Sequence, residues 1–314
     1  MISPRLYLAI AIALPLIIAC SPVVRNFGGF VQGCSAQGYA PDRYLAYCDT
    51  DYYGDYEHGA LYLETEPAAV AALQKAKILF LGDSRMQFAF STPSTRRALE
   101  RPGRAPYYLM GFGFGEEYRF SLATIDKLHL APKFLVVNID QLFFVDTESP
   151  PAKAVLSDAG ALADYRAKAV KQAFHATLCR ILTSICGSSG SIFRSRENGF
   201  WYTANYHKPD SQPVVDSGQV NETMLAQLVP GGEDFLARIA VPRSCIVFVN
   251  TPQSVWPDAS ARELARRLGI TYVAARDRDW ATLDGSHLVP ESAARWSAQI
   301  LDQITPTIDR CVSG

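Results

Sequence analysis

The sequence lacks a long run of charge of one sign, and its 30 Lys and Arg nearly balance its 31 Asp and Glu. Because nucleic-acid-binding surfaces carry an excess of basic residues, no RNA or DNA partner is expected. The chain also has no Cys-x-x-Cys pair and no histidines at metal-ligand spacing, so neither a metal nor another cofactor is expected. Internal repeats are missing too, which excludes repeat architectures.

One apolar stretch stands out at the N-terminus. Residues 6–20 are apolar without interruption, with Arg5 before them and Arg25 after them. Residues 6–24 reach the lower length limit of a spanning helix, which predicts a periplasmic protein anchored in the inner membrane. Two alternatives stay open: a lipoprotein attached through Cys20, and a cleaved signal peptide.

Six cysteines follow that stretch. An even number suits an oxidising compartment and predicts disulfides, with Cys34–Cys48, Cys179–Cys186 and Cys245–Cys311 as the expected pairs. The alternative is that several of these cysteines are small buried apolar residues.

Short apolar runs of strand length alternate with helical patterns from residue 75 onward. Bare apolar runs suit strands that are covered on both faces, and their alternation with helices predicts a parallel α/β sheet. The expected strands are 78–81, 107–110, 134–139, 246–250 and 271–274, and the expected helices are 67–75, 116–130, 161–182, 260–269 and 290–304.

Three parts are expected: a signal or anchor segment over 1–24, an N-terminal extension over 25–74, and a main domain over 75–314. The extension has no sustained hydrophobic period, which predicts irregular structure that packs on the main domain. The pattern also loosens over 146–241, which indicates an insertion or lid.

A serine follows the first strand of the main domain directly, in Leu79-Phe80-Leu81-Gly82-Asp83-Ser84-Arg85. In parallel α/β folds, ligands bind at the carboxyl ends of strands, and free amides at a helix start hold a developing oxyanion. Ser84 is therefore a candidate nucleophile. The alternative is that this string is an ordinary turn and helix cap.

The second candidate string lies just before the last helix and contains Asp284-Gly285-Ser286-His287. An Asp three residues before a His, within a turn, can fix the tautomer of the imidazole and stabilise its charged form. Asp284 and His287 are therefore candidate acid and base partners of Ser84. Taken singly, each is more simply a turn residue or a surface histidine.

A serine turn after the first strand and an Asp-x-x-His before the last helix resemble the end blocks of the SGNH/GDSL hydrolase superfamily. The resemblance spans about residues 75–305. It implies a three-layer α/β/α sandwich with a central parallel sheet, related to the flavodoxin arrangement, and acyl transfer through an acyl-enzyme.

The resemblance also implies oxyanion and substrate-binding residues. The oxyanion glycine of the family corresponds to Gly113 or Gly115, and the spacing does not choose between them. The Gly-x-Asn-Asp string of the family has no match here; Asn138 lies inside the predicted strand, and Gln141 is the candidate amide donor.

Arg85 departs from the commonest string of the family. Together with the N-terminal segment, it resembles the SGNH-like proteins of envelope polysaccharide acylation. Arg85 is thus a candidate for binding an anionic substrate group, and the alternative is an ion pair with Glu116, Glu117 or Asp140. An aromatic group, Phe200 to Tyr202 with Tyr206, is either a sugar platform or packing.

The leading expectation is an exported esterase or O-acyltransferase acting on a cell-envelope glycan. The alternative is a catalytically inactive SGNH-fold protein that binds glycan or assists a membrane acyltransferase or synthase. A lipase or thioesterase is a third possibility, and it would need a wide apolar cleft.

Overall fold

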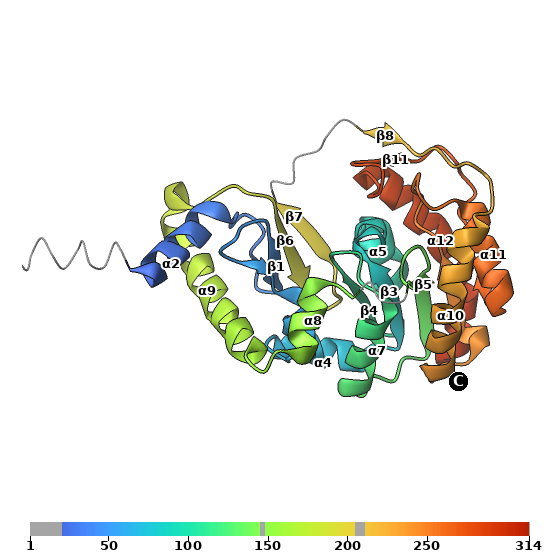
Figure 1. Cartoon of the computed structure of the whole chain (residues 1–314), viewed down its shortest axis with the longest axis horizontal. Helices are drawn as coiled ribbons and strands as arrows, with labels where there is room; N and C mark the ends of the chain where they lie inside the picture. The colour runs from blue at the N-terminus through green and yellow to red at the C-terminus, as the bar shows by residue number, and fades with distance from the viewer. Residues whose placement is uncertain (1–20, 145–147, 205–210, 314) are drawn as a thin grey trace, which may run out of the picture.

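The centre of the molecule is a five-stranded parallel sheet (Figure 1). The computed structural model describes residues 21–144, 148–204 and 211–313. The strand order is β10-β9-β5-β3-β4, and every neighbouring pair is parallel, which confirms the predicted α/β class. The strands are β3 (Ile78–Asp83), β4 (Tyr107–Phe112), β5 (Phe134–Asn138), β9 (Ile246–Val249) and β10 (Thr271–Tyr272).

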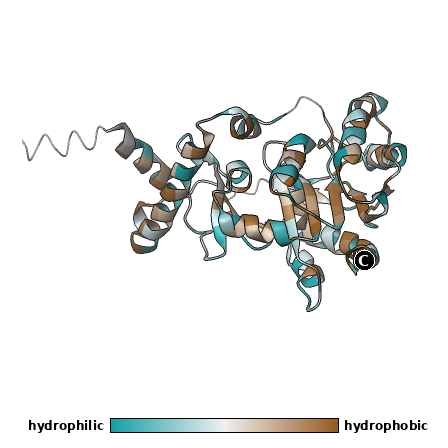
Figure 2. Cartoon of the chain, turned by 90° about the horizontal axis from the view of Figure 1, so that it is seen from below, coloured by the Kyte–Doolittle hydropathy of each residue, from teal (hydrophilic) through white to brown (hydrophobic). Residues whose placement is uncertain are grey.

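Helices cover both faces of this sheet, because side chains alternate along each strand and both sets are apolar. In β3, Ile78 and Phe80 face one apolar core, whereas Leu79 and Leu81 face the other. In Figure 2 the strands of the sheet are mostly brown, the colour of hydrophobic residues. The first core is closed by α5 (Ser84–Phe90), α6 (Pro93–Leu99) and α12 (Pro290–Ser313), and the second by α4 (Pro67–Lys75), α7 (Tyr118–Lys127), α10 (Glu222–Arg238) and α11 (Asp258–Leu268).

Helix ends follow local signals where these are strong. Helix α11 stops at Gly269, whose φ of 67° is the left-handed conformation that glycine tolerates best. Helix α4 has the predicted bounds. Helix α12 continues nine residues past the predicted end at Ile304, because Ile308 is buried in the core that α12 closes and Cys311 is tied by a disulfide.

The N-terminal extension is not irregular, so that prediction is wrong. It contains α2 (Pro22–Gly33), β1 (Arg43–Cys48), β2 (Gly54–Asp55) and α3 (Glu57–Tyr62) before α4. Strand β1 pairs with β6 (Ser191–Ser195) of the insertion, in a second, antiparallel sheet of order β2-β1-β6-β7. The sequence pattern missed this because the pairing joins segments about 150 residues apart.

The insertion completes this second unit. It contributes α8 (Pro150–Ser157), α9 (Ala161–Ile181), β6 and β7 (Trp201–Ala204). Figure 1 shows α2, α9 and the second sheet side by side, away from α11 and α12. Two short strands, β8 (Gln212–Pro213) and β11 (Ala281–Thr282), form a separate antiparallel pair.

Buried Arg194 of β6 joins the two sheets. Its guanidinium donates to the carbonyl oxygens of Leu109 and Gly111 on β4, at the edge of the parallel sheet. The amide of Leu109 also donates to the Asn198 carbonyl at 2.9 Å. These contacts satisfy backbone groups that an edge strand would otherwise leave open.

The three predicted disulfides are all present. Their Cα–Cα distances are 5.8 Å for Cys34–Cys48, 5.9 Å for Cys179–Cys186 and 5.9 Å for Cys245–Cys311. They close loops within the second unit and fasten the end of α12 to the start of β9.

The prediction of a periplasmic protein with an N-terminal membrane anchor is not supported, because no helix among the described residues is both long and apolar enough to span a membrane. Helix α2, where the described chain begins, has 12 residues, whereas a spanning helix needs about 20. Residues 6–20 and the alternative lipidation site Cys20 lie outside the described residues.

Candidate active site

Ser84 stands where the strand order of the main sheet changes direction. Strand β3 lies between β4 and β5, so the chain passes from β3 to β4 on one side and then crosses to β5 on the other side. Open parallel sheets bind ligands at such a position. The Asp83 carboxylate accepts from the amide of Arg85 at 2.8 Å and caps α5, which starts at Ser84. The local sequence therefore places the Ser84 side chain, half-buried, at the carboxyl edge of the sheet.

A chain of hydrogen bonds joins the three predicted triad residues. Ser84 Oγ lies 2.8 Å from His287 Nε2, and His287 Nδ1 lies 2.7 Å from Asp284 Oδ2. Ser84 and His287 are 203 residues apart in sequence. Both ring nitrogens of His287 are therefore engaged, one by the hydroxyl and the other by the carboxylate.

The loop that carries Asp284 and His287 is tightly fixed. Asp284 Oδ1 accepts from the amides of Ser286 at 3.0 Å and His287 at 2.8 Å. The Leu283 amide donates to the His287 carbonyl at 2.7 Å. Partial burial alone would raise the pKa of Asp284, but the hydrogen bonds from the His287 side chain and amide outweigh it and hold this pKa below its usual value. Asp284 is therefore ionised whenever His287 needs a negative partner.

Arg85 turns back to the protein and forms an ion-pair network. Its Nη1 donates to Asp83, and to Asp140 at 2.7 Å, while its Nε donates to Ser286 Oγ at 2.8 Å. Gln253 Nε2 also donates to Asp140, at 3.2 Å. Of the three predicted ion-pair partners, the structure selects Asp140, and it adds Asp83.

Burial sets the ionisation of this network. It raises the pKa of Asp83 to about 7, with a further increase from Asp140, while Arg85 opposes both. Burial lowers the pKa of Arg85, but Asp140 and Asp83 outweigh this and the net pKa rises, so the guanidinium stays charged. By bonding Ser286, Arg85 links the nucleophile turn to the loop of His287.

The residues predicted to bind the oxyanion are only partly near the triad. In the β3–β4 register Asp83 pairs with Phe112, so Gly113 follows directly beside Ser84. However, the Gly113 amide donates to Glu57 Oε1 at 2.8 Å and is not directed at a substrate.

Gly115 and Gln141 line a pocket away from the triad. Gly115 has a φ of +63°, and both residues line a pocket of about 840 Å³ whose described lining contains no triad residue. Asn138 ends β5, is buried, and accepts from the Thr251 amide at 2.8 Å. It therefore ties β5 to the loop after β9.

Glu57 is a buried residue that the sequence pattern did not identify. Besides the Gly113 amide, it accepts from Arg194 Nη1 at 3.0 Å and from Trp201 Nε1 at 3.0 Å. It therefore fixes the loop after β4 against the second sheet. Its only sequence signal is a charged residue within an aromatic segment, which does not separate it from a surface carboxylate.

The other histidines that the structure describes have partners other than the Ser84 hydroxyl or are exposed. His58 is buried between Asp55, at 2.8 Å from Nδ1, and Glu116, at 2.9 Å from Nε2. His175 is buried against Tyr39, and His129 is exposed. His207 lies outside the described residues.

Two clusters bring potential metal ligands together. In Asp55, Glu57 and His58, protein donors already engage the carboxylates, and both ring nitrogens of His58 are bonded. In the second, His175 lies beside Cys179 and Cys186, whose sulfurs form a disulfide and are not available as thiolates.

Two members of the predicted aromatic group are buried. Phe200 and Trp201 are 2% and 6% exposed, so they are packing residues and not an open sugar platform. The Phe88 ring lies between Trp201, at a centroid distance of 5.8 Å, and His287, at 4.8 Å. Tyr206 lies outside the described residues.

A large hollow adjoins the triad loop. It has a volume of about 780 Å³ and is lined by residues that include Asn250, Gln253, Trp256, Asp258 and Arg262. Its Gln253 bonds Asp140 of the Arg85 network, and the next residue, Ser254, donates its amide to the Gly285 carbonyl at 3.4 Å.

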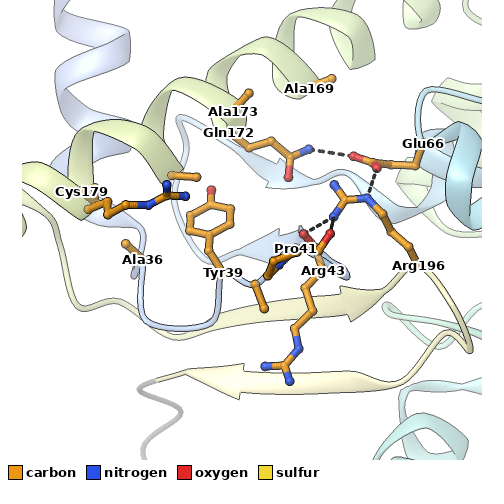
Figure 3. Close-up of a pocket in the computed structure, with 13 residues that line it drawn as sticks. Ala36, Tyr39, Pro41, Arg43, Glu66, Ala169, Gln172, Ala173, Cys179 and Arg196 are labelled. Carbon is orange, nitrogen blue, oxygen red and sulfur yellow. Dashed lines mark hydrogen bonds and ion pairs between the residues drawn. The ribbon is translucent and has the colours of Figure 1, made fainter.

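Another cavity, of about 740 Å³, lies in the second unit (Figure 3). Its polar groups bind one another: Glu66 accepts from Arg196 at 2.8 Å and from Gln172 at 3.4 Å. No triad residue is among the described residues that line it.

Comparison with protein-family models, curated proteins and solved structures finds no match to this chain.

Proposed function

We propose that this chain is a serine-dependent acyl-ester hydrolase or O-acyltransferase, with Ser84 as nucleophile and His287 as its base. The observation that carries the proposal is the 2.8 Å contact between Ser84 Oγ and His287 Nε2, continued by the 2.7 Å contact to Asp284. A hydroxyl, an imidazole and an ionised carboxylate in this order are the parts that nucleophilic acyl transfer needs.

An SGNH-type three-layer sandwich is part of the same proposal. Its support is that the two end blocks that resemble the family, far apart in sequence, meet at the carboxyl edge of a parallel sheet. Each block alone has a simpler reading as a turn or cap. Their contact is hard to explain as packing, because both groups are polar and directed at each other.

The first half of the reaction acylates Ser84. Its Oγ bonds to the ester carbonyl carbon while its proton passes to His287 Nε2, and Asp284 stabilises the imidazolium. The tetrahedral intermediate then breaks its bond to the alkoxy oxygen. That oxygen takes the proton from His287 and leaves as an alcohol, with the acyl group on Ser84.

The second half reverses these roles. Water, or a sugar hydroxyl, gives its proton to His287 and attacks the acyl carbon, and the bond to Ser84 Oγ breaks as His287 returns the proton to the serine. Water yields a carboxylic acid, and a sugar hydroxyl yields a new ester.

Oxyanion donors come from α5 in this proposal. The first amides of a helix have no acceptor within the helix. Asp83 accepts from the amides of Arg85 and Met86, and the amide of Ser84 is the proposed donor to the substrate. The amide of Gly113 is held by Glu57. Each missing donor costs about 3 kcal/mol of transition-state stabilisation, so modest turnover is expected.

A cell-envelope glycan is the proposed carrier of the ester. The 780 Å³ hollow beside the triad loop supports this choice, since it combines carboxylates, guanidinium groups and tryptophans. A polyhydroxylated ligand both donates and accepts hydrogen bonds and suits such a mixed lining. A fatty chain does not.

One observation favours a second candidate, a glycan-binding partner of an acyltransferase or synthase. Glu57 occupies the Gly113 amide, and Arg85 is engaged by two carboxylates, so two groups suited to substrate are taken by the protein. The hydrogen-bonded triad argues against this candidate, because a binding protein does not need it.

Turnover of p-nitrophenyl acetate and of an acetylated oligosaccharide by the full chain tests the proposal. We expect Ser84→Ala and His287→Ala to lower kcat at least about a thousandfold. Asp284→Asn should cost less, about a hundredfold, because this side chain is 42% exposed and water shares its role. Ser157→Ala, on the exposed face of α8, is the matched control.

Mass spectrometry should find the acyl group on the peptide that contains Ser84. Folded protein that gives neither turnover nor adduct, yet binds the oligosaccharide, would exclude the enzyme and support the binding partner.

A further inference from the structure

A small, mostly apolar pocket lies against Phe88 of α5 and against Leu283 and Leu288, which flank the triad loop. Its volume is about 150 Å³, and its lining includes Phe88, Trp201, Thr203, Leu283, Leu288 and Ala293. No charged side chain is among the described residues that line it. It is much smaller than the hollow of about 780 Å³ that adjoins the triad loop, so the two suit different parts of a substrate.

Three observations relate this pocket to Ser84 and His287. Phe88 lies one helical turn after Ser84 on α5, so both project from the same side of the helix. The Phe88 ring is 4.8 Å from the ring of His287. Leu283 and Leu288 directly flank the segment from Asp284 to His287. An acyl group bound to Ser84 Oγ therefore has this pocket within reach.

The wall of the pocket that Trp201 forms is rigid. The Trp201 indole donates to buried Glu57 at 3.0 Å, and the Trp201 amide donates to Ser91 Oγ at 2.9 Å. Glu57 is held in turn by Arg194. Such a wall resists widening, so the pocket has a defined size limit.

Size and polarity together indicate the ligand. A dry cavity of about 150 Å³ lined by Leu, Ile and Phe holds one benzene molecule, that is, about six carbon atoms. A carboxylate would lose its hydration there without meeting a cation, because Arg85 is already paired. The pocket therefore suits an uncharged hydrocarbon chain.

We propose that the pocket lined by Phe88 and Trp201 binds the acyl chain of the ester, and that it accepts uncharged acyl groups of two to about six carbons. This rests on the proposed acyl transfer through Ser84 and names its acyl donor class. The second unit thereby contributes to specificity, since Trp201 and Thr203 belong to β7.

Chain-length selectivity tests the proposal with p-nitrophenyl acetate, butyrate, hexanoate, octanoate and laurate and the full chain. Each methylene that enters the pocket should raise kcat/KM by about fourfold, up to about six carbons. Beyond six carbons, kcat/KM should fall at least about tenfold. Equal turnover of all lengths, or a maximum at laurate, would overturn the acyl pocket and leave the proposed enzyme standing.

Thr203→Phe fills the pocket from an exposed position on β7, where a larger side chain is tolerated. We expect the ratio of hexanoate to acetate kcat/KM to fall at least about tenfold. Thr177→Phe makes the same change at an exposed position of α9, outside the pocket lining, and should leave the ratio unchanged. An unchanged ratio in Thr203→Phe would contradict the proposal.

Calorimetric binding of hexanamide separates the two proposals. Binding to wild type that Thr203→Phe removes, without turnover of any ester, would keep the pocket and exclude the enzyme. If hexanamide does not bind and no ester turns over, both proposals fail.

Discussion

Arg85, which directly follows the proposed nucleophile Ser84, serves the fold. Asp83 and Asp140, 2% and 0% exposed, both accept from its guanidinium, and Ser286 accepts from its Nε. Two buried carboxylates close together repel each other and need a cation between them. Its sequence position leaves both substrate binding and ion pairing open. Its surroundings favour the ion pair, because the guanidinium lies against two buried carboxylates.

Arg85→Met should therefore lower the free energy of unfolding by about 3–5 kcal/mol, since it leaves two buried carboxylates without a counter-ion. Urea denaturation measures this loss. The double variant Arg85→Met/Asp140→Asn should recover part of it, because one charge is removed together with its partner.

Unchanged stability of Arg85→Met, with a raised KM for anionic esters alone, would instead assign Arg85 to the substrate.

Helix α3 and the loop after β4 form one buried polar element. Glu57 binds the Gly113 amide, and His58 binds Asp55 and Glu116. Burial alone would lower the pKa of His58, but the two carboxylates outweigh it and raise the pKa to about 10. This imidazole is therefore charged at neutral pH and holds the loop that runs beside Ser84.

His58 makes stability depend on pH in a defined direction. Its folded pKa lies above the ordinary value of about 6.5, so its ion pairs contribute fully below pH 6.5 and are lost as pH rises toward 10. Between pH 7 and 9.5, this group should lower the free energy of unfolding by up to about 1.4 kcal/mol per pH unit. Urea denaturation across this range should show the slope in wild type, and His58→Asn should remove it.

An NMR titration gives an independent test if His58→Asn folds poorly. The ring protons of His58 should not shift between pH 5.5 and 8.5, and a midpoint near pH 6.5 would contradict the charged state.

At the scale of the molecule, the described residues form a parallel and an antiparallel sheet joined at an edge, a short β8–β11 pair, and three disulfides. A disulfide stabilises the fold mainly by restricting the unfolded chain, so the contribution of each bond to stability grows with the length of the loop that it closes. The sequence separations are 66 for Cys245–Cys311, 14 for Cys34–Cys48 and 7 for Cys179–Cys186.

Replacing Cys245 and Cys311 with serine should cost about 4 kcal/mol of stability, against about 3 for Cys34/Cys48 and about 2 for Cys179/Cys186. Thermal melting of the three double variants under non-reducing conditions gives the order. The reverse order would mean that the second unit, and not the fastening of α12 to β9, limits stability.

The sequence by itself predicted the strands of the main sheet, both ends of α4 and the glycine stop of α11, because these depend on local signals: apolar runs of strand length, and proline and glycine at helix ends. The short spacings of Cys34–Cys48 and Cys179–Cys186 are local signals too, whereas Cys245–Cys311 joins residues 66 apart. It also singled out Ser84, Asp284 and His287 as candidates, since each lies in a short turn next to a regular element, and the structure brings the three into hydrogen-bond contact. Only the tertiary structure decided the rest. The pairing of β1 with β6, the capture of the Gly113 amide by Glu57, and the packing of Phe88 between Trp201 and His287 all join distant segments. Such contacts leave no periodic signal in a single sequence, because the free energy that selects them comes from burial and charge pairing in the folded chain.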